Sequence, residues 1–242
     1  MDNSDAGTTG PPGHIAPAHI APTAIIGNAF RPLLDGREFP AGQDVVIGPG
    51  VWIGHYATVG NGVTIGASSI LEDFAVVQPG AVIGARVLVS CRSSVGIGAT
   101  LGDDSVIKGH VGDHSKIGAR CRIAGDLIHR QLDPTIPWDD PAAEEPAPIV
   151  GDGAFVGWRA LIVGGVNIGA GAYVCAGALI TKDVPAGHIA WDRNQVTHPR
   201  SWPGALGKSA FFHDSGHLDS GRPRLSARLR RPQSKGGRGS GR

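Results

Sequence analysis

Residues 47–107 read IGPGVWIGHYATVGNGVTIGASSILEDFAVVQPGAVIGARVLVSCRSSVGIGATLGDDSVI, and they carry an aliphatic residue at every sixth position. The series is Ile47, Ile53, Val59, Ile65, Leu71, Val77, Ile83, Val89, Val95, Leu101 and Ile107. An amphipathic helix repeats its apolar residues about every 3.6 positions and a half-buried strand about every 2, so a strict period of six fits neither alone. The period indicates short strands joined by tight turns, and it predicts a parallel β-helix, an all-β fold.

A second position of the repeat is also restricted. The residue four places after each aliphatic one is small or β-branched: Val51, Ala57, Val63, Ser69, Ala75, Ala81, Val87, Ser93, Ala99 and Ser105. One large and one small residue per hexad suit the interior of a narrow triangular prism. We expect each hexad to form one face, so that three hexads make a coil and coils stack about 4.8 Å apart. The backbone groups of each coil then pair with the next coil.

The repeat also defines the expected domain organisation. Its period slips after Ile107, resumes at Val111, and breaks again at a proline-rich, acidic loop over residues 129–148. A long loop inside a compact domain is usually functional when it is ordered. The expected boundaries are a disordered N-terminus over 1–13, a β-helix domain over 14–185 with an insertion at 30–44, a C-terminal cap over 186–221 and a flexible basic tail over 222–242.

Composition agrees with a solenoid and excludes several classes. The chain holds 38 Gly and 18 Pro but only 5% aromatic residues, as a repeat of tight corners requires. Its net charge is +1, yet residues 222–242 hold eight Lys or Arg and no acid. The remainder therefore has 22 − 8 = 14 basic against 21 acidic residues, a net charge of −7. No run reaches the roughly 18 apolar residues of a membrane span, and the start lacks the form of a signal peptide, so we expect a soluble, cytoplasmic protein.

The cysteines give no sign of a disulfide framework or a zinc site. Cys91, Cys121 and Cys175 are far apart, and no Cys-x-x-Cys pair is present. We expect Cys91 and Cys121 to be small buried residues, and Cys175 to lie outside or at a corner.

Residues 148–187, PIVGDGAFVGWRALIVGGVNIGAGAYVCAGALITKDVPAG, resemble the closing coils of the hexapeptide-repeat acyltransferases, which include the maltose, galactoside and xenobiotic O-acetyltransferases. The matching segments are Val150-Gly151-Asp152, Phe155-Val156-Gly157, Gly165-Val166-Asn167-Ile168-Gly169, Ala176-Gly177-Ala178 and Thr181-Lys182-Asp183-Val184-Pro185. The resemblance implies a left-handed prism, a homotrimer with active sites in the clefts between subunits, and acetyl-CoA lying along the outside of the last coils.

The resemblance also implies a general base. In the family, a His on the loop before the closing coils takes the acceptor's proton, and His129 stands at that place, 22 residues before Gly151. A His side chain titrates near neutral pH and suits this role. Asp133 is the expected partner that orients the imidazole, and Asp126 is a second candidate. Trp138, in the same loop, is a candidate for the wall of the acceptor site.

Acyl transfer further needs a bound donor and N–H groups that meet the developing negative charge. The residues that we expect to bind acetyl-CoA are Trp158, Arg159, Ala160, Gly165, Ala176, Gly177, Lys182 and Arg193. The glycine-rich corners at Gly164-Gly165 and Ala176-Gly177 are expected to leave backbone N–H groups open. No covalent acyl-enzyme and no metal are required. After Pro185 the chain departs from the family's usual segment, and Arg193 or Arg200 would then hold the adenine end of CoA.

Two other functions stay open. The γ-type carbonic anhydrases are built on the same prism with three His around a metal, and His110, His114 and His129 would be the corresponding residues here. A non-catalytic scaffold is the second alternative, with the basic tail at 222–242 binding nucleic acid or anionic lipid. The tail has no interleaved aromatic residues, so nucleic-acid binding is not expected. The favoured function is transfer of an acetyl group from acetyl-CoA to a hydroxyl or amine of a sugar or small natural product.

Overall fold

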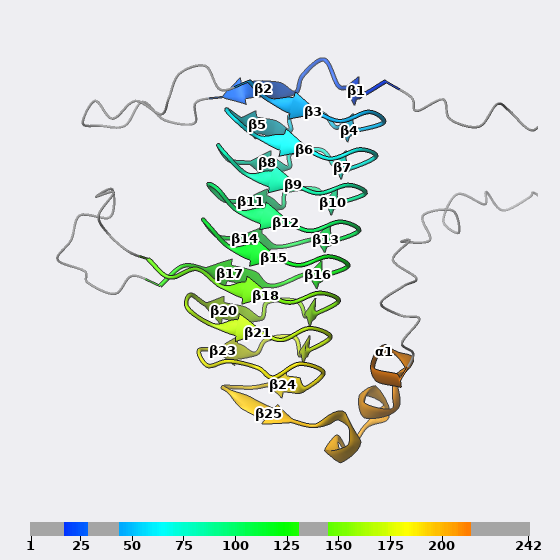
Figure 1. The fold of residues 1–242 in the computed structure, drawn as a ribbon, viewed down its shortest axis with the longest axis vertical. Helices are drawn as coiled ribbons and strands as arrows, with labels where there is room; N and C mark the ends of the chain where they lie inside the picture. Colours follow the sequence, from blue (N-terminus) through cyan, green and yellow to red (C-terminus); the bar gives the residue numbers. More distant parts are fainter. Residues whose placement is uncertain (1–16, 29–43, 131–144, 214–242) are drawn as a thin grey trace, which may run out of the picture.

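The computed structural model describes residues 17–28, 44–130 and 145–213. These residues form a three-sided column of stacked coils (Figure 1). The column is a left-handed parallel β-solenoid, as predicted. The expected disordered N-terminus, the insertion at 30–44 apart from Asp44, and the basic tail lie outside the described residues, as does the loop between 131 and 144. None of the helices in the described part of the chain is long and apolar enough to cross a membrane.

Three parallel sheets make the three faces, and each sheet takes one strand from every coil. Sheet A consists of β1 (His19–Ile20), β4 (Trp52–Ile53), β7 (Ile70–Leu71), β10 (Leu88–Val89), β13 (Val106–Ile107), β16 (Arg122–Ile123), β19 (Phe155–Val156), β22 (Tyr173–Val174), β24 (Ile189–Trp191) and β25 (Gln195–Thr197). Sheet B consists of β2 (Ile25–Asn28), β5 (Thr58–Gly60), β8 (Val76–Val77), β11 (Ser94–Val95), β14 (His110–Val111), β17 (Asp126–Ile128), β20 (Leu161–Val163) and β23 (Leu179–Ile180). Sheet C consists of β3 (Val46–Ile47), β6 (Thr64–Ile65), β9 (Val82–Ile83), β12 (Thr100–Leu101), β15 (Lys116–Ile117), β18 (Ile149–Val150) and β21 (Asn167–Ile168).

The interior is filled as the period predicts. In the strands up to β23 the second residue is the large aliphatic one, and it pairs in register with its counterpart in the next coil, as Val89 does with Ile107. From Ile53 onward these residues have almost no exposed surface. The small residues of the repeat, such as Ala57 and Ala99, are buried beside them. The first residue of each strand therefore points away from the axis, because successive side chains of a strand face opposite ways.

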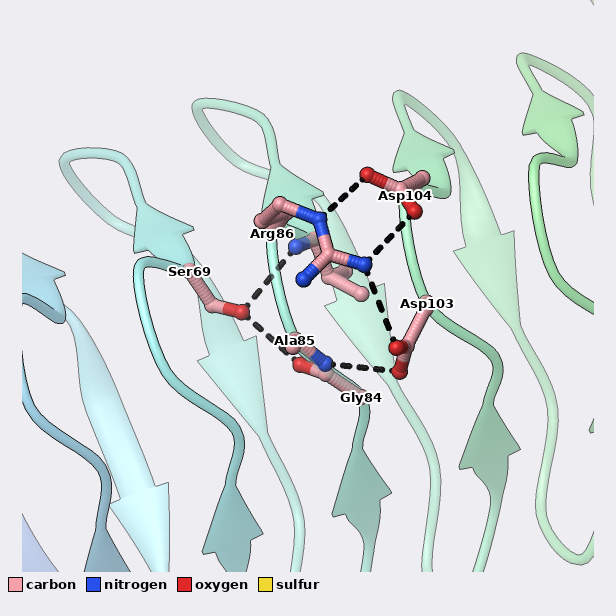
Figure 2. A network of polar contacts seen from close by, with 7 residues as sticks. Ser69, Gly84, Ala85, Arg86, Asp103 and Asp104 are labelled. Carbon is pink, nitrogen blue, oxygen red and sulfur yellow. Dashed lines mark hydrogen bonds and ion pairs between the residues drawn. The ribbon is translucent and has the colours of Figure 1, made fainter. Parts of the chain in front are cut away.

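The turns between strands also stack from coil to coil. In most turns the third residue has a positive φ, and its N–H donates to a carbonyl of the turn above, as that of Phe74 does to His55 O at 2.9 Å. At several turns a carboxylate accepts the N–H of the second residue. Figure 2 shows one of them, where Asp103 accepts from the Ala85 N–H at 2.9 Å. The same view shows the guanidinium of Arg86 held by Asp104 at 2.6 and 2.8 Å.

Two successive coils lack the turn between sheets A and B. Only Lys108 and Gly109 separate β13 from β14, and only two residues, 124–125, separate β16 from β17, against four in a regular coil. The slip after Ile107 follows from the sequence analysis, whereas the second slip was not foreseen. A Cβ atom on residue 109 would collide with the carbonyl oxygen of Gly125, so the close approach of these two corners requires glycine. We call this place the interrupted corner.

The solenoid continues beyond the predicted end at residue 185. Strand β24 pairs in parallel with β22, and β25 then turns back antiparallel to β24. Two 3-10 helices, η1 (Pro199–Ser201) and η2 (Ala205–Lys208), and a short α1 (Ala210–His213) follow. The ring of Phe211 packs edge-on against Phe155 and Tyr173, so this segment covers the outer face of sheet A at its C-terminal end.

The expectation for one cysteine was wrong. Cys121 occupies the small-residue position of its hexad and is buried, as expected, and Cys175 lies at a corner. Cys91 is exposed, because it is the second residue of a turn rather than an interior position.

Candidate active site

The two ends of the loop after β17 bring His129 and Glu145 together. The Arg130 N–H donates to Pro146 O at 3.0 Å, which closes the base of the loop. His129 Nε2 then lies 2.6 Å from Glu145 Oε2. The His129 side chain is 41% exposed and that of Glu145 20% exposed, so the pair is reached by solvent mainly from the imidazole side.

This contact defines what the imidazole can do. A carboxylate only accepts hydrogen bonds, so Nε2 carries the proton and the lone pair of the neutral ring lies on Nδ1. If Nδ1 takes a proton, the imidazolium stands beside a carboxylate, which stabilises its charge. A His held in this way has the properties of a general base whose tautomer is fixed by a carboxylate partner.

The sequence analysis named other partners for this His. Asp133 lies outside the described residues, as does Trp138. The Asp126 carboxylate accepts instead from the backbone N–H of His110 at 3.2 Å. Glu145 was missed because 16 positions separate it from His129. A signal was nevertheless present, since a loop inserted between stacked coils must return beside the residue where it leaves.

The predicted cofactor residues lie along both edges of sheet B. On the edge toward sheet A are the turns of β19 and β22, and the predicted residues there are Trp158, Arg159, Ala160, Ala176 and Gly177, with Arg193 in the bridge to Leu179. On the edge toward sheet C are Gly165 and Lys182, in the turns below His129. Gly165 adjoins the loop directly, because its N–H donates to Ala147 O at 3.3 Å. The outward side chains Leu161 and Leu179 lie between the two edges.

Some predicted contacts with the cofactor are not available. The N–H groups of Gly165 and Gly177 are not open, since the first donates to Ala147 O and the second to Trp158 O at 2.9 Å. The physical reason is that turns stack as well as strands, and the third residue of a turn donates to the coil above. Ala160 is fully buried, its N–H donates to Gly157 O and its carbonyl accepts from Asp126, so it has little to offer a ligand.

Other turn N–H groups remain for a ligand. In the upper coils, carboxylates accept from the N–H of second turn residues such as His55 and Ala119. Within the described residues no such carboxylate meets the corresponding N–H of Trp158, Gly164 or Ala176. These donors flank the two outward leucines of β20 and β23, Leu161 and Leu179, which we call the Leu161–Leu179 strip of sheet B. A ligand with carbonyl oxygens and an apolar chain, such as an acyl-pantetheine arm, matches this arrangement of donors and leucines.

The three histidines of the metal alternative do not gather in this chain. His110 Nδ1 lies 2.7 Å from Ser94 Oγ, and His129 contacts Glu145. His114 is the third residue of an exposed turn, with a φ of 56°. In the part of the chain that the structure describes, no three His, Cys, Asp or Glu side chains lie close enough together to hold a metal ion.

Comparison with known families bears directly on the repeat. Residues 44–79 match a model described as bacterial transferase hexapeptide (six repeats). Residues 149–182 match a model described as hexapeptide repeat of succinyl-transferase. Both matches fall on segments that form the coils of the solenoid. The second match falls on the closing coils whose sequence resembles the acyltransferases, between His129 and the end of sheet B.

Curated relatives match a part of this chain. The bifunctional protein GlmU of Francisella tularensis subsp. tularensis (strain WY96-3418) is 35% identical over 100 residues, which is 41% of this chain and 20% of the relative. GlmU of Francisella tularensis subsp. novicida (strain U112) is 37% identical over 93 residues, or 38% of this chain and 18% of the relative. The chain thus spans about a fifth of the length of these relatives.

Solved structures are similar to this chain at low sequence identity. A Bacillus cereus protein assigned as an acetyltransferase has a TM-score of 0.45 and 18% identity, covering 82% of this chain and 94% of its own. PerB from Caulobacter crescentus, solved with CoA and GDP-perosamine, has a TM-score of 0.24 and 21% identity, covering 76% of this chain and 58% of its own.

Proposed function

We propose that this protein is an acyltransferase that moves an acetyl group from acetyl-CoA to a hydroxyl or amine of a sugar or small natural product. The observation that carries the proposal is the His129–Glu145 pair at the base of the loop, directly above the closing coils that resemble acyltransferases. The match of those coils to a hexapeptide repeat of succinyl-transferase supports the same chemistry.

The transfer would be direct. As the acceptor oxygen or nitrogen attacks the thioester carbon, its proton passes to Nδ1 of His129, and Glu145 stabilises the imidazolium that results. The tetrahedral oxyanion needs N–H donors, and the open turn N–H groups of the closing coils are the candidates. When the C–S bond breaks, the imidazolium returns its proton to the departing sulfur. The products are CoA and the acylated acceptor, and the base is regenerated.

The donor would be held beside sheet B. We assign the phosphates of CoA to Arg159, Lys182 and Arg193, all of which are exposed, and the pantetheine arm to the Leu161–Leu179 strip with its flanking turns. Ala160 drops out of this set because it is buried. We further propose a cytoplasmic homotrimer with the site shared between subunits, as the resemblance of the closing coils to the hexapeptide-repeat acyltransferases implies. Sedimentation equilibrium tests the trimer.

The deciding experiment compares His129→Ala with the unchanged protein. The purified protein, stripped of metal, is titrated with acetyl-CoA in a calorimeter, and turnover is read as free thiol released in the presence of an acceptor panel. We expect one acetyl-CoA per chain in both proteins and a fall in turnover of about 100-fold or more in the variant.

His114→Ala is the matched control, because it removes an exposed imidazole from a neighbouring turn. Its turnover should stay within a factor of about 2 of the unchanged protein. Absence of binding with both acetyl-CoA and succinyl-CoA would overturn the proposed donor. Full turnover in the His129 variant would remove this residue from the mechanism.

A further inference from the structure

The outer face of sheet B carries a polar column that the proposed mechanism does not use. Ser94, His110 and Asp126 are the first residues of β11, β14 and β17, and they stand in register in three successive coils. Ser94 Oγ lies 2.7 Å from His110 Nδ1, and Asp126 Oδ1 accepts from the His110 N–H at 3.2 Å. The same column is apolar above and below, with Val76 in β8 and Leu161 in β20.

The column keeps unused hydrogen-bonding capacity. Asp126 is exposed, and only one of its carboxylate oxygens meets the His110 N–H. His110 is half-buried, with Nδ1 engaged by Ser94 and Nε2 left as donor or acceptor according to the tautomer. A hydroxyl such as that of Ser94 can both donate and accept. A ligand lying on this face would thus meet a carboxylate, an imidazole nitrogen and a hydroxyl within three coils.

The interrupted corner lies at one edge of the same column. His110 and Asp126 directly follow Gly109 and Gly125, so no turn stands between these side chains and sheet A over two coils. The first turn below the interruption carries Trp158, and this residue is 59% exposed. Elsewhere on this edge the turn aromatics stack on one another, as Tyr56 does on Phe74 at 5.2 Å. Within the described residues, no ring contact involves Trp158.

An exposed indole one coil below a column of a carboxylate, an imidazole and a hydroxyl matches one class of small molecule. A pyranose ring has an apolar face of C–H groups that packs on an aromatic plane, and a rim of hydroxyls that both donate and accept. Gly109 and Gly125, which directly precede His110 and Asp126, carry no side chain that would block the ring, although the exposed Lys108 lies at the same corner. A purely apolar ligand would offer no hydrogen bond to the second carboxylate oxygen of Asp126 or to Nε2 of His110, and a polyanion would be repelled by the Asp126 carboxylate.

We propose that Ser94, His110, Asp126 and Trp158 form a binding subsite for a pyranose ring. The role of this sugar as the acyl acceptor rests on the proposed acyltransferase function. The binding of the sugar to the subsite does not depend on that function. Ser94, His110 and Asp126 lie above the Leu161–Leu179 strip on sheet B, so a sugar held by them and a donor held on the strip would share one face of the solenoid.

Saturation-transfer NMR with the full chain tests the subsite. The probes are methyl pyranosides of glucose, galactose, mannose, N-acetylglucosamine and rhamnose. We expect saturation transfer to at least one of them, and an affinity about tenfold lower in Asp126→Asn, because the amide loses a charge-assisted hydrogen bond but still accepts the His110 N–H. Trp158→Ala and Ser94→Ala should also bind more weakly.

The controls remove the same chemistry from the upper coils. Asp73→Asn changes a carboxylate that accepts the His55 N–H at 2.7 Å, and Tyr56→Ala removes an exposed aromatic ring from the same edge. Both should bind the pyranoside as the unchanged protein does. Thermal unfolding verifies that each variant is folded.

The outcomes separate the subsite from the reaction. No transfer to any pyranoside, or equal binding by Asp126→Asn, Trp158→Ala and Ser94→Ala, would overturn the subsite. If pyranosides fail to bind but thiol release from acetyl-CoA proceeds with another acceptor, the proposed acyltransferase function is supported and the sugar subsite is overturned. If pyranosides bind in the predicted pattern while acetyl-CoA does not bind, the subsite is supported and the proposed reaction is overturned.

Discussion

His129 Nε2 and Glu145 Oε2 lie 2.6 Å apart although 16 positions separate the two residues in the sequence. Since the carboxylate fixes the tautomer and stabilises the imidazolium, Glu145→Gln should lower kcat about tenfold or more while leaving the affinity for acetyl-CoA unchanged. Steady-state kinetics together with calorimetry measure both quantities. Glu72→Gln is the control, because that carboxylate accepts from Ser90 Oγ and the Cys91 N–H in an upper coil. Equal kcat in the two variants would mean that Glu145 only shapes the loop.

Much of this architecture follows from the sequence because the repeat is local. The hexad period identifies which side chains face the axis, and residues such as Ile53 and Ala57 are buried as predicted. Counting hexads in threes would also assign each turn to an edge. Such a count places Trp158 and Lys182, both predicted to bind the cofactor, on opposite edges of sheet B.

The features that the sequence does not predict depend on contacts between coils, and the hexad period carries no information about such contacts. The N–H of Gly177 is occupied because the turn above it supplies a carbonyl at the right height. Glu145 meets His129 because the loop closes through Arg130 and Pro146. The second missing turn, at Gly125, was overlooked because it falls next to the loop, where the period is lost.

The interrupted corner should be sensitive to a single methyl group. Gly109→Ala places a Cβ against the carbonyl oxygen of Gly125, and backbone on both sides must shift. We expect a loss of about 2 to 3 kcal/mol in the free energy of unfolding, measured with urea. Gly171→Ala is the control, because its φ is +62° but no atom lies within 4 Å of the added Cβ. It should cost only about 1 kcal/mol, the strain of a left-handed residue. Equal losses would mean that the contact at Gly125 relaxes freely.

The Arg86 network of Figure 2 should contribute modestly and depend on salt. The neighbouring carboxylates of Asp104 and Asp103 raise the pKa of Arg86, chiefly through the hydrogen bond to Asp104, but the Arg86 side chain is 49% exposed. Arg86→Met should therefore lower the free energy of unfolding by about 1 kcal/mol or less, and by a smaller amount in 1 M salt. Asp104→Asn should give a similar result, since it removes the other half of the same pair. A loss that salt does not reduce would point to packing of the aliphatic stem instead.

The buried thiol of Cys121 should make stability depend on alkaline pH. Burial raises the pKa of Cys121 to about 11, and its Sγ–H donates to Gly151 O at 3.2 Å. Above pH 9 the unfolded chain loses the thiol proton while the folded chain keeps it, so the unfolded state binds fewer protons and stability falls as pH rises from 9 to about 11. The difference corresponds to about 2 to 3 kcal/mol at most. Tyr173, whose pKa is also raised by burial, contributes in the same direction, so the measurement compares the unchanged protein with Cys121→Ala. The variant should lose the part of the pH slope that belongs to the thiol, and identical slopes would show that Cys121 ionises as easily in the folded protein as in the unfolded chain.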